Sequence, residues 1–170
     1  TANTTGQENV AIGHAALTAN TTGNANLAIG ASALDANTTG TRNTAIGYQA
    51  YTASDTENDN LAIGYQAMTA NTAGGTQNLA VGNYALDALT SGDDNVAVGY
   101  AALGANTTGG ENTAIGRNAL LTNTTGNSNV SVGRSSMYAS TTGSNNVGVG
   151  VDSLKANTTG TENVAVGFSA

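Results

Sequence analysis

The sequence predicts an all-β protein, a parallel β-solenoid of ten coils stacked along one axis. The pattern Asn-x-small-(Ile/Val)-Gly occurs ten times in 170 residues, at spacings of 17 residues with a single spacing of 18. The amino-acid composition is correspondingly restricted, with 23 Gly, no Pro, no Cys and 9% charged residues. A repeat of this length is typical of β-solenoids, and one coil is too small to bury a core alone. The repeats begin at Asn9, Asn26, Asn43, Asn60, Asn78, Asn95, Asn112, Asn129, Asn146 and Asn163.

The first element of each repeat is predicted to be a short strand. Counting each repeat from its asparagine as position 1, Val10, Ala11 and Ile12 stand at positions 2 to 4. Side chains alternate along a strand, so Val10 and Ile12 share one face and Ala11 lies on the other. We expect the Ile/Val column to fill a thin interior. Gly13 and its equivalents then turn the chain, at positive φ or where backbones approach closely.

The second element is predicted to be another extended run, Ala16 to Ala19 in the first repeat, followed by a turn of sequence Asn-Thr-Thr-Gly. One helical turn per repeat is the alternative, although so short a helix is not stable alone in water. One repeat departs most, because Ser54-Asp55-Thr56-Glu57 replaces the turn sequence, and the one extra residue falls at Gly74-Gly75. The apolar column expected to face the interior is Leu17, Leu34, Tyr51, Met68, Leu86, Leu103, Leu120, Met137 and Leu154.

Stacking would place equivalent residues of neighbouring coils directly over one another. With a rise of ~4.8 Å per coil, ten coils form a rod roughly 45–50 Å long. The asparagines at position 1 would then form an amide ladder, in which each side chain bonds to its neighbour. The sequence therefore predicts one repeat domain over residues 1–170.

Position 3 is small in every repeat, and this column is informative. A solvent-facing strand position would normally vary toward Thr or charged residues. We therefore expect the column to lie at an oligomer axis; the alternative is a second, narrow face of the solenoid interior. The column is Ala11, Ala28, Ala45, Ala62, Ala80, Ala97, Ala114, Ser131, Gly148 and Ala165.

Neither end shows an atypical capping repeat. The sequence begins at Thr1-Ala2-Asn3 and stops at Phe168-Ser169-Ala170, midway through repeats. Open solenoid ends expose strand edges that recruit further chains. The expectation is an uncapped segment of a longer fibre, or a subunit that stacks end to end.

The repeat resembles two groups of fibrous proteins. Asn-x-Ala-(Ile/Val)-Gly is similar to the head repeats of trimeric autotransporter adhesins. The longer form, seen at Thr39–Gly47 and Gly109–Gly116, resembles repeats of phage tail fibres and large bacterial surface proteins. The resemblance implies a left-handed β-roll, a homotrimer with the position 3 column at its axis, and an adhesive shaft on a cell surface or virion. The 17-residue period is longer than the adhesin repeat, and the anchoring and chaperone domains are missing here.

The composition excludes most kinds of catalytic and metal-binding site. Without Cys there are no disulfides or thiolate metal sites, and the lone His14 cannot build a triad or a zinc site. We expect no catalytic residues, no metal and no cofactor, and therefore no enzyme. Four basic residues against 11 acidic ones argue against nucleic acid as a partner, and no window is apolar enough to span a membrane. Asp93-Asp94 suggests a calcium site, although a solvated turn is the favoured interpretation.

Residues that follow the strand-ending glycine form the best candidate contact stripe. Stacking would align exposed rings and guanidiniums, which are favoured at recognition surfaces, against a host-surface glycan or protein receptor. The stripe comprises Tyr48, Tyr65, Tyr100, Arg117, Arg134 and Phe168.

Two turn features raise further alternatives. Asn-Thr-Thr triplets are formal glycosylation sequons, although turn chemistry is the favoured interpretation. They start at Asn3, Asn20, Asn37, Asn106, Asn123 and Asn157. The stacked Thr pairs suggest ice binding as a remote function. The leading hypothesis is an extracellular adhesive shaft, with a self-assembling end-to-end filament as the alternative.

Overall fold

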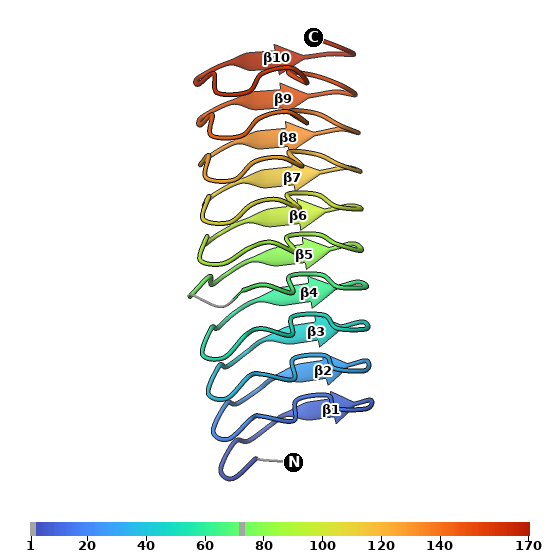
Figure 1. The fold of residues 1–170 in the computed structure, drawn as a ribbon, viewed down its shortest axis with the longest axis vertical. Helices are drawn as coiled ribbons and strands as arrows, with labels where there is room; N and C mark the ends of the chain where they lie inside the picture. The colour runs from blue at the N-terminus through green and yellow to red at the C-terminus, as the bar shows by residue number, and fades with distance from the viewer. Residues whose placement is uncertain (1–2, 72–73) are drawn as a thin grey trace.

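The protein is a rod of stacked coils built on one ten-stranded parallel sheet (Figure 1). The computed structural model describes residues 3–71 and 74–170, so the start at Thr1-Ala2 lies outside the described residues. The strands follow one another in chain order, and no helix forms in these two ranges. The predicted all-β parallel solenoid is confirmed. The strands are β1 (Val10–Ile12), β2 (Leu27–Ile29), β3 (Thr44–Ile46), β4 (Leu61–Ile63), β5 (Leu79–Val81), β6 (Val96–Val98), β7 (Thr113–Ile115), β8 (Val130–Val132), β9 (Val147–Val149) and β10 (Val164–Val166).

The strands pair in the register that the repeat predicts. Ala28 of β2 lies between Ala11 of β1 and Ala45 of β3, and every other pairing also joins equivalent positions. The longer spacing leaves this register intact, because Ala62 of β4 pairs with Ala80 of β5. We name each coil by its strand, so that coil 3 carries β3. The extra residue of coil 4 is therefore absorbed outside the sheet.

The two faces of the sheet are opposite to our expectation. The alanines at position 3 point inward and are fully buried, as at Ala28 and Ala97. Positions 2 and 4 point outward: Val10 is 47% exposed and Ile12 57% exposed, and their equivalents in the middle coils are half-buried. The position 3 column therefore does not lie at an oligomer axis, and the Ile/Val column does not fill the interior. The alternative, a narrow interior face, is correct.

The interior is narrow because a second small column faces the first. Position 8 is Ala in most coils and is buried, for example at Ala33 and Ala102. The apolar column at position 9 fills the remaining space, with Leu34 and Met68 fully buried. Two columns of methyl groups leave no room for a larger side chain at position 3, which explains its small residues without an external partner.

The second run of each coil is neither a strand nor a helix. Residues at positions 7 and 9 adopt left-handed backbone conformations, with φ of 57° at Ala15 and 51° at Leu17. Such conformations are costly for residues with a Cβ atom and persist only where the surroundings enforce them. Here the Leu17 N–H donates to the Ala33 carbonyl of the next coil (3.0 Å), and the Ser32 N–H donates to the His14 backbone carbonyl of the preceding coil (2.8 Å). The predicted second extended run is wrong, because hydrogen bonds between coils dictate a contorted path.

The glycine at position 5 is required by close approach. At Gly99, φ is 132°, and an added Cβ atom would lie within 3.0 Å of the Gly116 carbonyl in the next coil. The same holds along the stack of these glycines, so any side chain there would separate two coils.

Candidate functional site

The asparagines at position 1 form a continuous buried ladder through the rod. The Asn112 backbone N–H donates to Oδ1 of Asn95 (3.1 Å), and Asn112 Nδ2 donates to the same oxygen (3.2 Å). Asn95 Nδ2 donates in turn to Asn78 Oδ1 (3.0 Å) and to the Gly109 carbonyl (2.9 Å). Each rung therefore satisfies a backbone N–H of the next coil as well as its own side chain. These residues hold the stack together and are not accessible to a ligand.

The sequon asparagines at position 12 form a second ladder. Asn123 Nδ2 donates to Asn106 Oδ1 (3.0 Å) and to the Gly126 carbonyl (3.0 Å), and Asn37 Nδ2 contacts Asn20 in the same way. These four side chains are fully buried, so the folded rod withholds them from glycosylation. Asn3 is exposed and Asn157 half-buried. The triplets are turn chemistry at the four buried positions.

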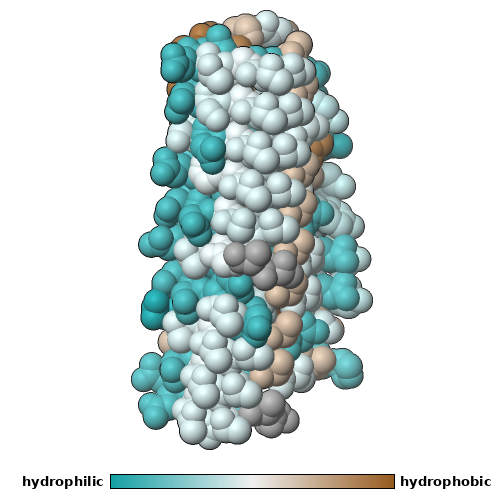
Figure 2. Space-filling model, turned by 60° about the vertical axis from the view of Figure 1, so that its left-hand side comes forward, coloured by the Kyte–Doolittle hydropathy of each residue, from teal (hydrophilic) through white to brown (hydrophobic). Residues whose placement is uncertain are grey.

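The threonines of the same turns split into two columns. At position 13 the hydroxyl donates to the equivalent carbonyl of the next coil, as from Thr107 to Thr124 (3.0 Å). At position 14 the side chain is exposed, as at Thr108 and Thr125. Figure 2 shows the edge formed by the turns that precede the strands, where neutral and hydrophilic colours dominate and brown is scarce. One exposed Thr column therefore remains for any contact with ice.

The candidate contact stripe is partly brought together. Tyr48 and Tyr65 stack with ring centroids 5.4 Å apart and planes 13° apart. Tyr84 then lies edge-on between Tyr65 and Tyr100, at 5.4 Å and 5.7 Å, and the Arg117 guanidinium lies 5.8 Å from the Tyr100 ring. The result is an unbroken aromatic ladder on the turns that follow the strands of coils 3 to 7. Sequence analysis missed Tyr84 because it stands one position beyond the column, where Asn83 breaks the run.

The stacking changes what this ladder can bind. Tyr48 and Tyr65 cover one face of each other, so a sugar ring cannot stack on those faces, whereas Tyr84 meets Tyr65 and Tyr100 edge-on. Tyr48 and Tyr100 are each 49% exposed. Desolvation is the largest cause that raises the pKa of the Tyr84 hydroxyl. Such a surface fits a partner that accepts hydrogen bonds along a row.

The other two stripe residues lie apart from the ladder. Arg134 contacts Asp152 of the next coil at 3.5 Å, and Asp152 also pairs with Lys155 at 3.0 Å. Phe168 lies in the last coil and is 79% exposed. Arg134 is therefore paired with a carboxylate, whereas the exposed Arg117 lies against a neutral ring and keeps its charge.

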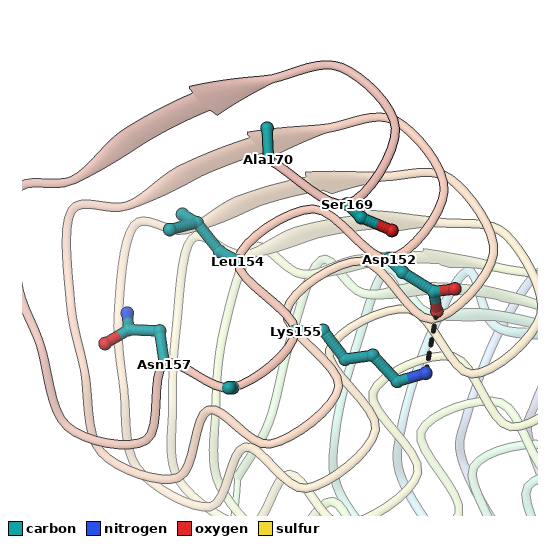
Figure 3. A pocket seen from close by; sticks show the side chains of 7 residues that line it. Asp152, Leu154, Lys155, Asn157, Ser169 and Ala170 are labelled. Carbon is teal, nitrogen blue, oxygen red and sulfur yellow. Dashed lines mark ion pairs between the residues drawn. The ribbon is translucent and has the colours of Figure 1, made fainter.

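No catalytic or metal constellation forms in residues 3–71 and 74–170. No three His, Asp or Glu side chains converge there on a position that could hold a metal ion. Asp93 Oδ1 instead accepts from the Thr76 N–H (2.7 Å), Asp94 is exposed, and so is His14. A cavity of about 450 Å³ lies at the last coil, lined by Asp152, Leu154 and Lys155 among others (Figure 3). It lies at the end of the stack, and its Asp152 and Lys155 side chains are paired with each other at 3.0 Å.

The outer face of the sheet is the largest exposed apolar feature. Positions 2 and 4 of ten strands carry only Val, Ile, Leu and two Thr, and no charged residue. The face measures roughly 48 Å by 10 Å, from ten strand spacings and three residues. A patch of this size falls within the range of the largest apolar patch on a typical monomer, and such patches are often functional.

Comparisons with protein-family models, curated proteins and solved structures find no match for this chain. The resemblance to adhesin and tail-fibre repeats therefore stays a prediction. Within the described residues, nothing forms a helix that is long and apolar enough to cross a membrane.

Proposed function

We propose that the chain is the rigid shaft of an extracellular adhesive fibre, such as a surface adhesin or a phage tail fibre, and that it carries no catalysis. The single observation that supports this most is the charge-free apolar face along all ten strands. A rod with such a face is built to lie against a partner along its whole length. Its location would be a cell surface or a virion.

The rigidity of the rod follows from the hydrogen bonds that join neighbouring coils. Each coil is tied to the next by strand pairing and by the asparagines at position 1, and some coils also by those at position 12. In such quasi-one-dimensional structures, stability is a sum over neighbouring coils. Bending the rod would strain many short hydrogen bonds at once.

The partner we propose for the sheet face is a second and third copy of the chain. Val98 and Ile63 are examples of the half-buried β-branched side chains in this face. Their neighbours already restrict them, so burying them costs little side-chain conformational entropy. Their burial stabilises by roughly 25 cal/mol per Å². Identical flat faces around a threefold axis form a closed assembly. This homotrimer places Val and Ile at the axis, with alanines inside each chain.

Sedimentation equilibrium tests the assembly. The wild-type chain should behave as a species of three times 16.6 kDa. Lysine at Ile63 and Val98 should give monomers that keep the fold, because the new charges cannot be desolvated at the axis. The matched control places lysine at Thr108 and Thr125, on exposed turns, and should stay trimeric. A monomeric wild type, or a trimer that survives both lysines, would refute the assignment.

Adhesion is assigned to the aromatic ladder. Its hydroxyl row would contact a host-surface glycan or a protein receptor, and binding of the purified rod to host cells should weaken when Tyr65 and Tyr100 are changed to Ala. The rod should remain folded, because both rings are exposed. Unchanged binding would remove the ladder from the function.

An end-to-end filament is the second candidate. Within the described residues β10 pairs with β9 alone, so the other edge of β10 has no partner strand. Another copy could pair with this edge as β10 pairs with β9. Light scattering distinguishes the two, because a filament lengthens with concentration and a trimer does not.

Ice binding is the remaining, remote candidate. It rests on the exposed threonine column at position 14, represented by Thr108 and Thr125. Inhibition of ice recrystallisation at micromolar protein, lost on Thr108→Lys, would support it. Growth of ice crystals at the rate seen in buffer would remove it.

A further inference from the structure

Two irregularities of the repeat lie next to each other in the structure, in coils 3 and 4. Coil 3 carries Ser54 where most coils have Asn, and Glu57 where every other complete turn has Gly. Coil 4 carries the extra residue, at Gly74-Gly75. Tyr51 of coil 3 replaces the usual Leu and is fully buried. We call Tyr51, Ser54, Glu57 and Gly74 the coil 3–4 joint.

The Glu57 carboxylate accepts from two N–H groups whose equivalents in a regular coil donate to the next coil. In a regular coil, the N–H groups of Thr107 and Thr108 both donate to the Thr124 carbonyl of the next coil, at 2.9 Å and 3.1 Å. In coil 3 the equivalent N–H groups, of Asp55 and Thr56, donate to Glu57 Oε2 at 2.8 Å and 3.0 Å. The substitute acceptor comes from the same coil.

The second carboxylate oxygen reaches the next coil. Gly74 N–H donates to Glu57 Oε1 at 3.1 Å, while Ser54 Oγ donates to Oε2 at 3.3 Å. Glu57 is only 4% exposed, so its charge is kept in the interior by four donors. Such charge-assisted bonds are stronger than neutral ones. The carboxylate therefore links coil 3 to coil 4 at the position of the extra residue.

Tyr51 makes the matching replacement in the second asparagine ladder. In regular coils, Nδ2 at position 12 donates to Oδ1 of the asparagine one coil earlier. Ser54 has no such oxygen, and Asn71 Nδ2 donates instead to the Tyr51 hydroxyl (3.0 Å), which also accepts from Asn60 Nδ2 (2.6 Å). The buried phenol thus joins both ladders across the irregular coil.

We propose that the coil 3–4 joint is a splice, in which the Glu57 carboxylate and the Tyr51 hydroxyl accept hydrogen bonds from coil 4 and so let that coil hold extra residues. Gly74 supports this: it is exposed, and an added Cβ atom there would meet nothing within 4 Å. The splice is the place in the rod that accepts an inserted loop. This inference does not depend on the proposed adhesive function.

A double-mutant cycle tests the coupling. Glu57→Gly alone removes the acceptor of the Asp55 and Thr56 N–H groups. Deletion of Gly74 alone gives the turn of coil 4 the regular length while Glu57 still occupies those two donors. Each should lower the thermal midpoint, and the two together should restore it to the wild-type value or above. Deletion of Thr108 from regular coil 6 should not be rescued by Glu57→Gly. Additive losses in the Glu57 and Gly74 cycle would overturn the proposal.

Amide exchange tests the role of the carboxylate directly. Glu57→Gln keeps the shape but leaves one acceptor oxygen, so the amide of Gly74, or those of Asp55 and Thr56, should exchange about tenfold faster. Glu162→Gln, at an exposed acid, should leave these rates unchanged. Unchanged protection at all three amides in the Glu57 variant would exclude the bridging role.

Insertion tests the consequence for the rod. A flexible Gly-Ser-Gly-Ser segment placed after Gly74 should leave the thermal midpoint unchanged. The same segment after Thr108 should lower it, because the regular turn donates its N–H groups to the next coil. Equal losses at the two sites would show that coil 4 has no special tolerance.

Discussion

Replacing Ser140 by Asn should stabilise the rod, because it repairs a break in the second asparagine ladder. Ser140 stands at position 12 of coil 8, above Asn123 and below Asn157. Its hydroxyl is buried without a hydrogen-bond partner, and so is Oδ1 of Asn123 beneath it. In regular coils that oxygen accepts from Nδ2 of the next rung, as Asn106 accepts from Asn123 at 3.0 Å. One missing amide therefore leaves two buried polar atoms unsatisfied.

The size of the effect follows from these bonds. The Ser140→Asn side chain can donate to Asn123 Oδ1 and to the Gly143 carbonyl, and can accept from Asn157 Nδ2. Each bond contributes about 1 kcal/mol net, and satisfying a buried acceptor adds a similar amount. Ordering the longer side chain costs about 1 kcal/mol. The expected gain is about 3 kcal/mol in the free energy of unfolding, or roughly 6–12 °C in the thermal midpoint.

Urea unfolding followed by tyrosine fluorescence measures the change, since the chain has six Tyr and no Trp. Ser140→Ala is the matched control: it removes the unpartnered hydroxyl but leaves Asn123 Oδ1 without a donor, so its gain should be under about 1 kcal/mol. If Ser140→Asn is no more stable than Ser140→Ala, the ladder does not stabilise the rod as argued.

Three further predictions concern the regular coils. Asn95→Ala should cost about 5 kcal/mol in urea unfolding, because four side-chain hydrogen bonds are lost and the buried N–H of Asn112 is left unpaired. Asn127→Ala, at an exposed side chain with one hydrogen bond, should cost under about 1 kcal/mol, and similar losses for the two variants would contradict the ladder. Gly99→Ala should cost at least about 3 kcal/mol, because its Cβ would collide with the next coil, and a wild-type midpoint would exclude that close approach. Burial raises the pKa of Asp87, so its ionisation opposes folding: the stabilising protonated form is lost as pH rises through the folded-state pKa. Asp87→Asn should therefore raise the thermal midpoint at pH 7 and change it little at pH 3. Glu162→Gln is the control and should show no such pH-dependent gain. Equal shifts of the midpoint for Asp87→Asn at both pH values would contradict the burial argument.

The register of the rod was predictable, but the direction of its faces was not. Alternation shows that Val10 and Ile12 share a face opposite Ala11, yet it does not say which face is inside. Hydrophobicity favours Val and Ile inside, but the interior is too narrow for them. The signal that could have decided this is the second small column, at Ala33 and Ala102, whose methyl groups face the sheet.

The path between strands could not be read from local preference. Ala and Leu disfavour left-handed conformations, and no rule of sequence places Ala15 and Leu17 there. Hydrogen bonds to neighbouring coils override that preference, and these exist only once the stack has formed. The same reason hid the coil 3–4 joint: Glu57 looks like a turn residue until the next coil supplies its fourth donor.

The aromatic ladder shows how a column can shift. Tyr48, Tyr65 and Tyr100 follow from the repeat, but Asn83 interrupts them. Tyr84 supplies the missing ring from the adjacent position. A search by column alone cannot detect such a substitution, because it depends on how far a long side chain reaches.

Distances between spin labels test the central claim, that each coil lies over the last in constant register. The chain has no Cys, so cysteines at Thr22 with Thr125, and at Thr22 with Thr142, carry unique labels on exposed turns six and seven coils apart. Diluted with unlabelled chain, the pairs should give distances of about 29 Å and 34 Å, rising by one strand spacing per coil. Distances that are equal, or that fail to rise by that step, would contradict the stack.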